Sequence, residues 1–465
     1  MRGKPACAAS VCSAKRKTAV EFSAASLCAV LQVLAPADAT GLVVALSGGG
    51  DSAALLAAAA SLGASFRGLP VRALHVDHGL QDAAADFRAA CVALCRRLDI
   101  PLSVVVVAVQ TTGGVSIEAA ARDARYAALA RQLRPGECLL TAHHRADQAE
   151  TWLLQALRGA GLKGMSSMPV RRRLGLGWHL RPLLDIAQPE LIALGAALGT
   201  FPASDPMNAD MRFDRGYLRR HIWPLIEARW PAAEVALARA ARHAADAQTL
   251  LERRAAADVG RLRDGEALSV PGLRALGAED RINAVRFWIS DAGVEPPSSA
   301  RLREALRQIF DADADHLPAI LWGGHALRRY RQRVFLTQAE LPRMQGTRSW
   351  IVAREALIEL GPGLGQLRRV AQIGGLAPQR LPETLWVRPR VGGESLRPAR
   401  AARTQRLRHL CQSQGVLPWM RDALPLVFAD EVLVAAADLW LEARRCAAAD
   451  APGVAFVWEQ APIIV

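Results

Sequence analysis

The chain has 465 residues and a mass of 49.9 kDa, the length of about three domains. Apolar residues make up 51% of it, but no run of 18 or more occurs, so a membrane-spanning helix is excluded. The formal net charge is +14, from 58 basic against 44 acidic residues, and this excess favours a polyanionic partner, nucleic acid rather than membrane. The eight cysteines are scattered without a C-x-x-C pair, which is typical of buried thiols in a reducing cytoplasm.

Composition and the spacing of predicted elements divide the chain into five parts. Residues 1–20 are basic and rich in Ala and Ser, lack the apolar core of a signal peptide, and are expected to form a flexible extension. In 21–228, predicted strands recur about every 30 residues with helices between them, which predicts an α/β catalytic domain with a parallel sheet. A mostly helical middle domain is predicted for 229–340, a Gly- and Pro-rich linker for 341–382, and a small α+β domain for 383–460.

The most informative stretch is 42–52, an apolar run that ends in Ser-Gly-Gly-Gly-Asp-Ser and continues into an Ala/Leu-rich segment. This is the order strand, phosphate loop, helix: glycines let the main chain approach an anion, and the first N–H groups of the helix favour phosphate. Neither the Walker motif nor the G-x-G-x-x-G dinucleotide fingerprint is present. An aspartate beside phosphates indicates a divalent metal between them. The predicted phosphate-binding residues are Ser47, Gly48, Gly49, Gly50, Asp51 and Ser52.

Polar residues also follow other predicted strands. One strand ends in the run 75–78, and another is followed by 143–147. Because ligands of parallel sheets bind at the carboxyl ends of the strands, both runs are expected to meet the phosphate loop at one edge. Asp147 and Glu150 are three residues apart on the next predicted helix and share a face, although a solvated acidic pair is the competing interpretation. The apolar run 101–109 predicts a strand buried on both faces.

Several basic segments lie outside these clusters. The arginine triplet 171–173 by itself is expected to be a solvated loop, the usual position of a charge run. Arg215 and Arg219 fall in a helical setting. A basic helix is predicted for 404–414 and a β-hairpin across 392–393. Clustered arginines in this last region favour an RNA-docking module, with a plain α+β cap as the alternative.

From about residue 22 to residue 458, the chain resembles the bacterial tRNA(Ile)-lysidine synthetases, which belong to the PP-loop ATP pyrophosphatases. The resemblance is carried by the order and combination of motifs across three domains, since no single motif is decisive. Beyond the phosphate loop, these motifs are Glu118-x3-Arg122-x2-Arg125-Tyr126 and the segments 75–80, 147–151, 158–168, 181–184, 205–206, 388–394 and 415–419.

The resemblance implies a reaction in two steps. ATP, with Mg²⁺, adenylates the C2 oxygen of the cytidine at the first anticodon position of the isoleucine tRNA that bears CAU. The ε-amine of free lysine then attacks C2 and expels AMP. The product, lysidine, pairs with A instead of G, so the tRNA changes from methionine-like to isoleucine identity. The partners implied are therefore this tRNA and free L-lysine, in the cytoplasm and without a membrane.

The resemblance also assigns roles to single residues. Asp51 and Asp147 are the implied catalytic residues, and Asp51 is the implied Mg²⁺ ligand. His75 joins the loop residues in ATP binding, while Asp147, Glu150 and Arg122 are the implied lysine-binding residues. The tRNA-binding residues are expected to be Arg158, Lys163, Arg215, Arg219, Arg388, Arg390, Arg406 and Arg408. The last four are expected to grip the acceptor side through phosphates.

The chain departs from the family pattern in places. Ala146 stands where the first of two aspartates is usual, so one carboxylate is missing, and Asp77 or His144 could take its place. Met207 and Gly216 replace a usual Ser and Asn. A sulfur-inserting PP-loop enzyme is one alternative, disfavoured by the lack of paired cysteines, and an ammonia-consuming ligase is another. A catalytically weakened tRNA-binding paralogue is the third. The sequence leaves the choice between monomer and homodimer open.

Overall fold

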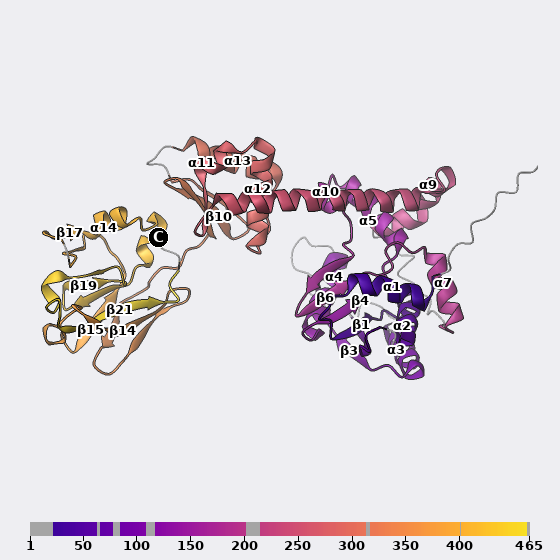
Figure 1. The fold of residues 1–465 in the computed structure, drawn as a ribbon, viewed down its shortest axis with the longest axis horizontal. Coiled ribbons are helices and arrows are strands. Elements are labelled where there is room, and N and C mark those ends of the chain that lie inside the picture. Colours follow the sequence, from indigo (N-terminus) through magenta and orange to yellow (C-terminus); the bar gives the residue numbers. More distant parts are fainter. Residues whose placement is uncertain are drawn as a thin grey trace, which may run out of the picture. The chain divides into compact units, whose positions relative to one another are not determined.

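The computed structural model describes residues 22–62, 66–77, 84–107, 117–200, 214–312, 317–399 and 401–462. The extension predicted for 1–20 therefore lies outside the described residues, as do Met207 and the Asp205-Pro206 segment. The chain divides into two compact units, 1–250 and 251–465 (Figure 1).

The first unit is built on a six-stranded sheet of order β3-β2-β1-β4-β6-β5. Five strands are parallel, and β5 pairs antiparallel to β6 at one edge. Their bounds are β1 Gly41–Ala45, β2 Val71–Asp77, β3 Leu102–Val106, β4 Glu137–Leu140, β5 Arg171–Leu174 and β6 Gly177–Leu180. The prediction of a parallel α/β sheet is confirmed.

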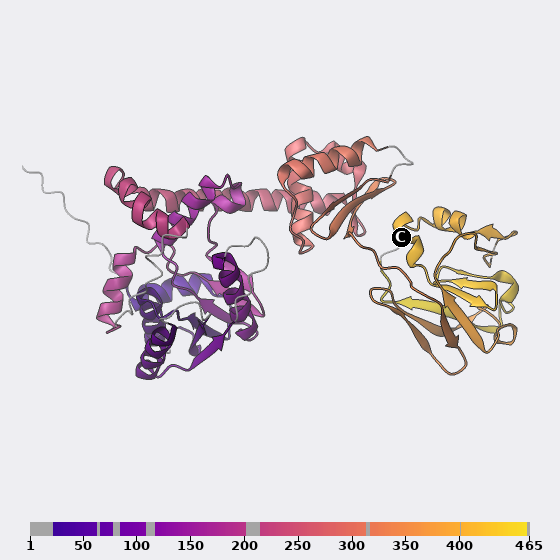
Figure 2. The same cartoon turned by 180° about the vertical axis from the view of Figure 1, so that it is seen from behind.

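Helices cover both faces of this sheet, because successive side chains of a strand point to opposite faces. Leu42 and Val44 of β1 face a core shared with α1, α2, α3 and α7, whereas Val43 packs on the other face with Leu129 of α4. Figure 2 shows these layers from behind. The helices are α1 Ala24–Leu34, α2 Gly50–Leu62, α3 Ala84–Leu98, α4 Ile117–Gln132 and α7 Gln188–Ala197.

Strand β3 differs from its prediction. It lies at the opposite edge of the sheet from β5, and Val104 and Val106 are 39% and 70% exposed. The apolar run was therefore wrongly assigned to a strand buried on both faces. The basic triplet 171–173 also differs, because it forms strand β5 and not a loop.

The remaining elements of the first unit follow β4 and β6. They are α5 Arg145–Leu157, α6 Leu162–Met165, α8 Asp214–Tyr217, a π-helix at Leu218–Ile222, α9 Trp223–Arg229 and the start of α10, Ala233–Leu262. Helix α5 begins at the carboxyl end of β4, so its first turn lies at the edge of the sheet where ligands of parallel sheets bind.

The second unit begins with the end of α10. Its first part contains the helices α11 Val270–Ala275, α12 Ala278–Asp291 and α13 Ser299–Asp311, in agreement with the predicted helical middle region. It also contains an antiparallel sheet of order β7-β8-β11-β10-β9. These strands are β7 Arg263–Asp264, β8 Ala267–Ser269, β9 Ala319–Trp322, β10 His325–Tyr330 and β11 Arg333–Gln338. Helices and sheet share one apolar core around Trp288, Leu302 and Val334.

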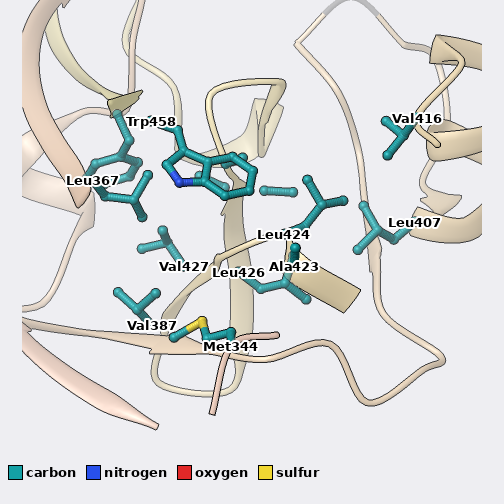
Figure 3. Close-up of a cluster of buried hydrophobic side chains, with 14 of the residues drawn as sticks. Met344, Leu367, Val387, Leu407, Val416, Ala423, Leu424, Leu426, Val427 and Trp458 are labelled. Atoms are coloured by element: carbon teal, nitrogen blue, oxygen red, sulfur yellow. The ribbon is translucent and has the colours of Figure 1, made fainter. Parts of the chain in front are cut away.

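The last part of the second unit is rich in strands. One sheet has the order β12-β15-β18-β19-β20 and another the order β13-β14-β21. Their bounds are β12 Arg348–Ile351, β13 Leu357–Gly361, β14 Gly365–Ile373, β15 Thr384–Arg388, β18 Leu426–Ala429, β19 Val432–Ala436, β20 Trp440–Leu441 and β21 Pro452–Glu459. Leu367, Val387, Val427 and Trp458 meet in the buried core (Figure 3).

Two predictions fail in this region. The stretch 341–382 is not a linker, because β12, β13 and β14 are integral to the two sheets. There is also no hairpin across 392–393 among the described residues: β15 pairs with β12 and β18, and β16, Ser395–Leu396, pairs with β17, Gln405–Arg406. The basic helix is present as α14, Leu407–Gln414, and ends at Gly415 with φ +85°.

Among the described residues, no helix is both long and apolar enough to cross a bilayer.

Candidate active site

The loop between β1 and α2 is ordered by its two serines. Ser47 Oγ lies 3.0 Å from Ser52 Oγ, and Ser52 Oγ donates to the Gly49 carbonyl at 2.9 Å. The Ser47 amide in turn donates to Ser52 Oγ at 3.2 Å. The loop is thereby held at the start of a 13-residue helix, whose first N–H groups have no partner within the helix. This is the geometry of a phosphate site.

Gly48 is the residue of this loop that tolerates no side chain. Its φ is +93°, and a Cβ added to it would lie 2.8 Å from Cδ1 of Phe87. Gly48→Ala is therefore expected to lower the rate of ATP–pyrophosphate exchange at least tenfold, because left-handed backbone costs about 1–2 kcal/mol and the loop must also move away from Phe87.

Gly68 provides a matched control for that substitution. Its φ is +62°, but a Cβ there would meet no atom within 4 Å. Gly68→Ala should lower the unfolding midpoint slightly and leave the exchange rate unchanged. Equal loss of exchange in both variants would show that backbone strain alone, and not the shape of the loop, explains the result for Gly48.

His75 lies beneath the loop. Its ring is 5% exposed, and Nδ1 donates to the Leu46 carbonyl at 2.8 Å. Sγ of Cys91 lies 3.6 Å from the same nitrogen. The structure thus places His75 where it supports the backbone that leads into the loop, and its predicted contact with ATP stays a prediction.

His144 joins the phosphate loop to the next strand end. Its Nε2 lies 3.6 Å from Oδ2 of Asp51 and 3.6 Å from Oδ2 of Asp147. Burial acts to lower the pKa of His144, but the hydrogen bond with Asp51 and the charges of both aspartates outweigh it and raise the pKa above its usual value. Nδ1 of the same ring is buried, and none of the described residues gives it a hydrogen-bond partner. His144 therefore lies between the carboxylates of Asp51 and Asp147. It is also close in sequence to Ala146, where the family pattern usually has a further aspartate.

Asp51 remains accessible at this edge. Its side chain is 30% exposed, and Nε2 of Gln188 donates to it at 3.2 Å. No group of three or more metal-ligating side chains occurs in the described part of the chain. Mg²⁺ binds nucleotide sites through one or two carboxylates together with phosphate oxygens. Asp51 is the carboxylate that fits this role.

Asp147 and Glu150 form a buried cluster with Arg215 and Arg219. Nε of Arg215 donates to Glu150 at 2.9 Å, and Arg219 donates to Glu150 at 2.6 Å and to Asp147 at 2.8 Å. Glu150 and Asp147 are 4% and 8% exposed. Burial would raise the pKa of Asp147, but His144 and the arginines lower it, so the carboxylate is ionised.

This cluster contains two of the arginines that were predicted to bind tRNA. The guanidinium groups of Arg215 and Arg219 pair with carboxylates here, and their contact with tRNA stays a prediction. The π-helix at Leu218–Ile222 carries Arg219 toward the acids. The sequence contained a signal for this pairing. Arg215 and Arg219 are four residues apart, so they share one face of a helix, and the two acids of α5, three residues apart, share one face of theirs.

A chain of hydrogen bonds runs beside the acids. Nε of Arg172 donates to Nδ1 of His179 at 3.3 Å, so Nε2–H of His179 donates to Thr141 Oγ1 at 2.8 Å. The Thr141 hydroxyl then donates to Nδ1 of His143 at 2.8 Å. Burial and the neighbouring Arg181 lower the pKa of His179 to about 2, which keeps its ring neutral and preserves this direction.

Arg122 lies in a group of arginines around Tyr126. The guanidinium carbons of Arg122, Arg125 and Arg172 lie 5.2, 5.5 and 4.9 Å from the centre of the Tyr126 ring. Burial raises the pKa of Tyr126, but Arg181 and its neighbours outweigh that effect and lower it. Among the described residues, Arg122 contacts this ring and forms no ion pair with Asp147 or Glu150.

The other residues predicted to bind tRNA differ in their surroundings. Arg158 pairs with Asp214 at 2.7 Å on the surface, and Lys163 is exposed on α6. Arg388 pairs with Glu431 at 3.0 Å, and Arg390 lies near Glu394 and Asp422. Arg406 and Arg408 are exposed at the start of α14, and Nε of Arg408 donates to Nε2 of His409 at 3.1 Å.

Comparison with known proteins agrees with these features. Three family models match the chain: a PP-loop domain over 24–226, a TilS substrate binding domain over 268–335, and a TilS substrate C-terminal domain over 385–458. Together with the fold and the phosphate loop, they define a PP-loop enzyme that uses ATP.

Similar whole proteins narrow the class. The chain is 39% identical to a tRNA(Ile)-lysidine synthase of Alkalilimnicola ehrlichii, over 95% of this chain and 98% of the relative. It is 37% identical to that of Xanthomonas axonopodis pv. citri, over 92% and 96%, and 41% identical to that of Pseudomonas aeruginosa, over 88% and 92%. The chain belongs to the tRNA(Ile)-lysidine synthase family, a family of ligases that modify tRNA.

Proposed function

We propose that this chain joins free L-lysine to C2 of the cytidine at the first anticodon position of tRNA(Ile) with anticodon CAU. The observation that carries the proposal is the edge where the phosphate loop, Asp51, His144 and the acids of α5 meet. This edge supplies a site for the phosphates of ATP and, a few ångströms from it, buried carboxylates that suit an amine substrate. The product would pair with A, and the tRNA would change from methionine-like to isoleucine identity.

The first step is adenylation of the base. The C2 oxygen of the cytidine attacks the α phosphorus of ATP, and the bond between the α and β phosphates breaks, which releases pyrophosphate. The N–H groups at the start of α2 and the hydroxyl of Ser47 would bind the departing phosphates. Mg²⁺ held by Asp51 would neutralise part of their charge.

The second step requires a neutral lysine amine. The ε-ammonium first loses one proton to solvent; the neutral amine then attacks C2, the bond from C2 to the adenylated oxygen breaks, and AMP leaves with that electron pair. Asp147 and Glu150 are the proposed partners of the lysine ammonium groups, which must compete with Arg215 and Arg219 for them. Arg122 is the proposed partner of the lysine carboxylate, because a guanidinium binds a carboxylate with two parallel hydrogen bonds.

Exchange of labelled pyrophosphate into ATP tests the order of these steps. With tRNA(Ile) present and lysine absent, the protein should catalyse exchange, because adenylation precedes lysine attack. Added lysine should then release AMP and consume the adenylated tRNA. Exchange that proceeds with lysine but without tRNA would contradict the proposal, since it would mean that lysine and not the base is adenylated.

Two exposed arginines of the C-terminal region are proposed to contact tRNA phosphates. Arg406→Ala/Arg408→Ala should weaken tRNA binding equally for all sequences and lower the slope of log affinity against log salt by about 1 for each lost contact. Arg388→Ala/Arg390→Ala should have a smaller effect, because carboxylates already neutralise these two side chains. An unchanged slope for the first double variant would refute the assignment.

A further inference from the structure

The exposed edge strand of the catalytic sheet carries three consecutive arginines. Strand β5 lies beyond β6 at the end of the sheet, and Arg171, Arg172 and Arg173 are all exposed on it. We call these three residues the arginine edge. Neither the ATP site nor the acid cluster uses them.

The side chains of the arginine edge are held in place by aromatic rings. Arg171 and Arg173 lie on one face of the strand, with guanidinium carbons 5.1 and 3.8 Å from the centre of the Trp178 ring. Arg172 lies on the other face and stacks on Tyr126 at 4.9 Å. A stacked guanidinium keeps its N–H groups free at its rim, and the stacking limits its rotamers, so it is preorganised for an anion.

In the part of the chain that the structure describes, no carboxylate pairs with this group. Among the described residues, Arg171 donates to the Leu34 carbonyl, Arg172 to His179, and Arg173 makes only its contact with Trp178. Other arginines of the same unit are paired, such as Arg72 with Glu137, Arg145 with Glu234 and Arg242 with Asp185. Arg122, Arg125 and Arg181 beside Tyr126 add further positive charge, and no carboxylate of the described ranges pairs with them.

The arginine edge is connected to the candidate active site. Arg172 begins the hydrogen-bond chain that passes through His179 and Thr141 to His143, and the charge of Asp147 acts on His143. Arg171 also pairs with Leu180, the last residue of the parallel strand β6, so the start of β5 lies at the sheet edge where the parallel strands end and where the candidate active site is built.

We infer that the arginine edge binds backbone phosphates of the tRNA close to the reacting nucleotide. The inference rests on the proposed function for the identity of the RNA, but the surface itself follows from the uncompensated charge. Phosphate is the anion that suits it, because planar guanidinium groups bind phosphate oxygens in pairs and contact a nucleic acid without reading its sequence.

Protection of the sheet edge is the competing role for these arginines. Charged side chains on an edge strand prevent pairing with another chain. That role requires charge alone and gives no reason for stacking on Trp178. It also predicts a different result when the charges are removed, namely self-association with unchanged RNA binding.

The test compares the affinity of the full chain for tRNA(Ile) across a series of salt concentrations. Arg171→Ala/Arg173→Ala should lower the slope of log affinity against log salt by about 1.4–1.8, at 0.7–0.9 for each neutralised phosphate. Arg96→Ala/Arg131→Ala is the matched control, since both arginines are exposed in the same unit and no described carboxylate pairs with them. The control should keep the slope of the wild type.

Trp178→Leu tests whether stacking on Trp178 orders Arg171 and Arg173 for phosphate binding, without changing the charge of the arginine edge. This variant keeps all three arginines, so the salt slope should stay that of the wild type while affinity falls severalfold. Size-exclusion chromatography and thermal unfolding of each variant identify self-association or loss of fold. An unchanged slope and affinity in Arg171→Ala/Arg173→Ala, with or without self-association, would overturn the inference.

A separate measurement, lysine incorporation, tests the proposed reaction independently of tRNA binding by the arginine edge. Incorporation of labelled lysine by the wild type reports on the proposed function and not on this surface. Wild type that incorporates no lysine, but binds tRNA with a slope that the double variant lowers, would refute the reaction and support the arginine edge as an RNA-binding surface.

Discussion

Asp51→Asn should lower both ATP–pyrophosphate exchange and lysine incorporation by about 100- to 1,000-fold. The substitution keeps the shape of the side chain but removes the charge that lies 3.6 Å from His144 and faces the proposed leaving group. Loss of one preorganised electrostatic contact in an active site commonly has an effect of this size. The amide should also bind Mg²⁺ more weakly, so raising the Mg²⁺ concentration should restore part of the rate.

Asp99→Asn is the matched control for this variant. Asp99 is exposed and lies just before β3, at the amino end of that strand and therefore away from the carboxyl ends where the candidate site lies. Its φ is +53°, a backbone conformation that Asn tolerates well. It should exchange pyrophosphate at the wild-type rate. If Asp51→Asn keeps half of the wild-type rate or more, Asp51 does not have the proposed role.

Glu150→Gln should destabilise the first unit by about 2–3 kcal/mol and abolish lysine incorporation. Glu150 accepts hydrogen bonds from Arg215 and Arg219, and its loss leaves two guanidinium groups with Asp147 alone. Removing one member of a buried ion pair costs about 3–5 kcal/mol, and the partial exposure of the two arginines reduces the figure here. Urea unfolding measures the loss of stability.

Asp185→Asn provides the comparison, because Asp185 also pairs with an arginine, Arg242, but both side chains are mostly exposed. Its effect should stay within about 0.5 kcal/mol. Glu150 is expected both to stabilise the fold and to bind lysine, and pyrophosphate exchange distinguishes these two roles. Exchange requires no lysine, so it should persist in the folded fraction of Glu150→Gln. Loss of exchange together with lysine incorporation, in protein that remains folded, would contradict its assignment to the lysine step.

Much of the catalytic unit could be predicted from local signals. The phosphate loop is recognisable from 47–52, and the apolar segments that form β1 and β4 are buried on both faces. The apolar run around β3 gave the same signal at an edge, where Val106 is exposed. Apolar composition reports burial on average and does not report the position of a strand in its sheet.

The errors in the second unit arise from long-range pairing. The stretch 341–382 has the glycines of tight turns, such as Gly361 at φ +113° and Gly363 at φ +71°, and a Gly-rich hairpin resembles a linker in composition. Strand β14 is stabilised by β21, almost ninety residues further along the chain. The expected hairpin at 392–393 fails for the same reason, since β15 pairs with distant strands.

The candidate site shows the same limit. Asp51, Asp147 and Glu150 could be proposed from spacing and from the ends of strands. The pairing of the two acids with Arg215 and Arg219, some sixty-five to seventy-two residues away, depends on the tertiary fold. The arginine triplet was expected to be a loop, because a charge run predicts exposure but not the aromatic rings on which its side chains stack.

The most direct test of the central claim is incorporation of labelled lysine into tRNA, followed by mapping of the modified nucleotide. Wild type with ATP should label the isoleucine tRNA with anticodon CAU, at the cytidine of the first anticodon position and nowhere else. Labelling should require ATP and should be lost in Asp51→Asn. Absence of lysine in this tRNA despite intact ATP and tRNA binding would contradict the proposed reaction, and a label on another nucleotide would contradict the proposed substrate.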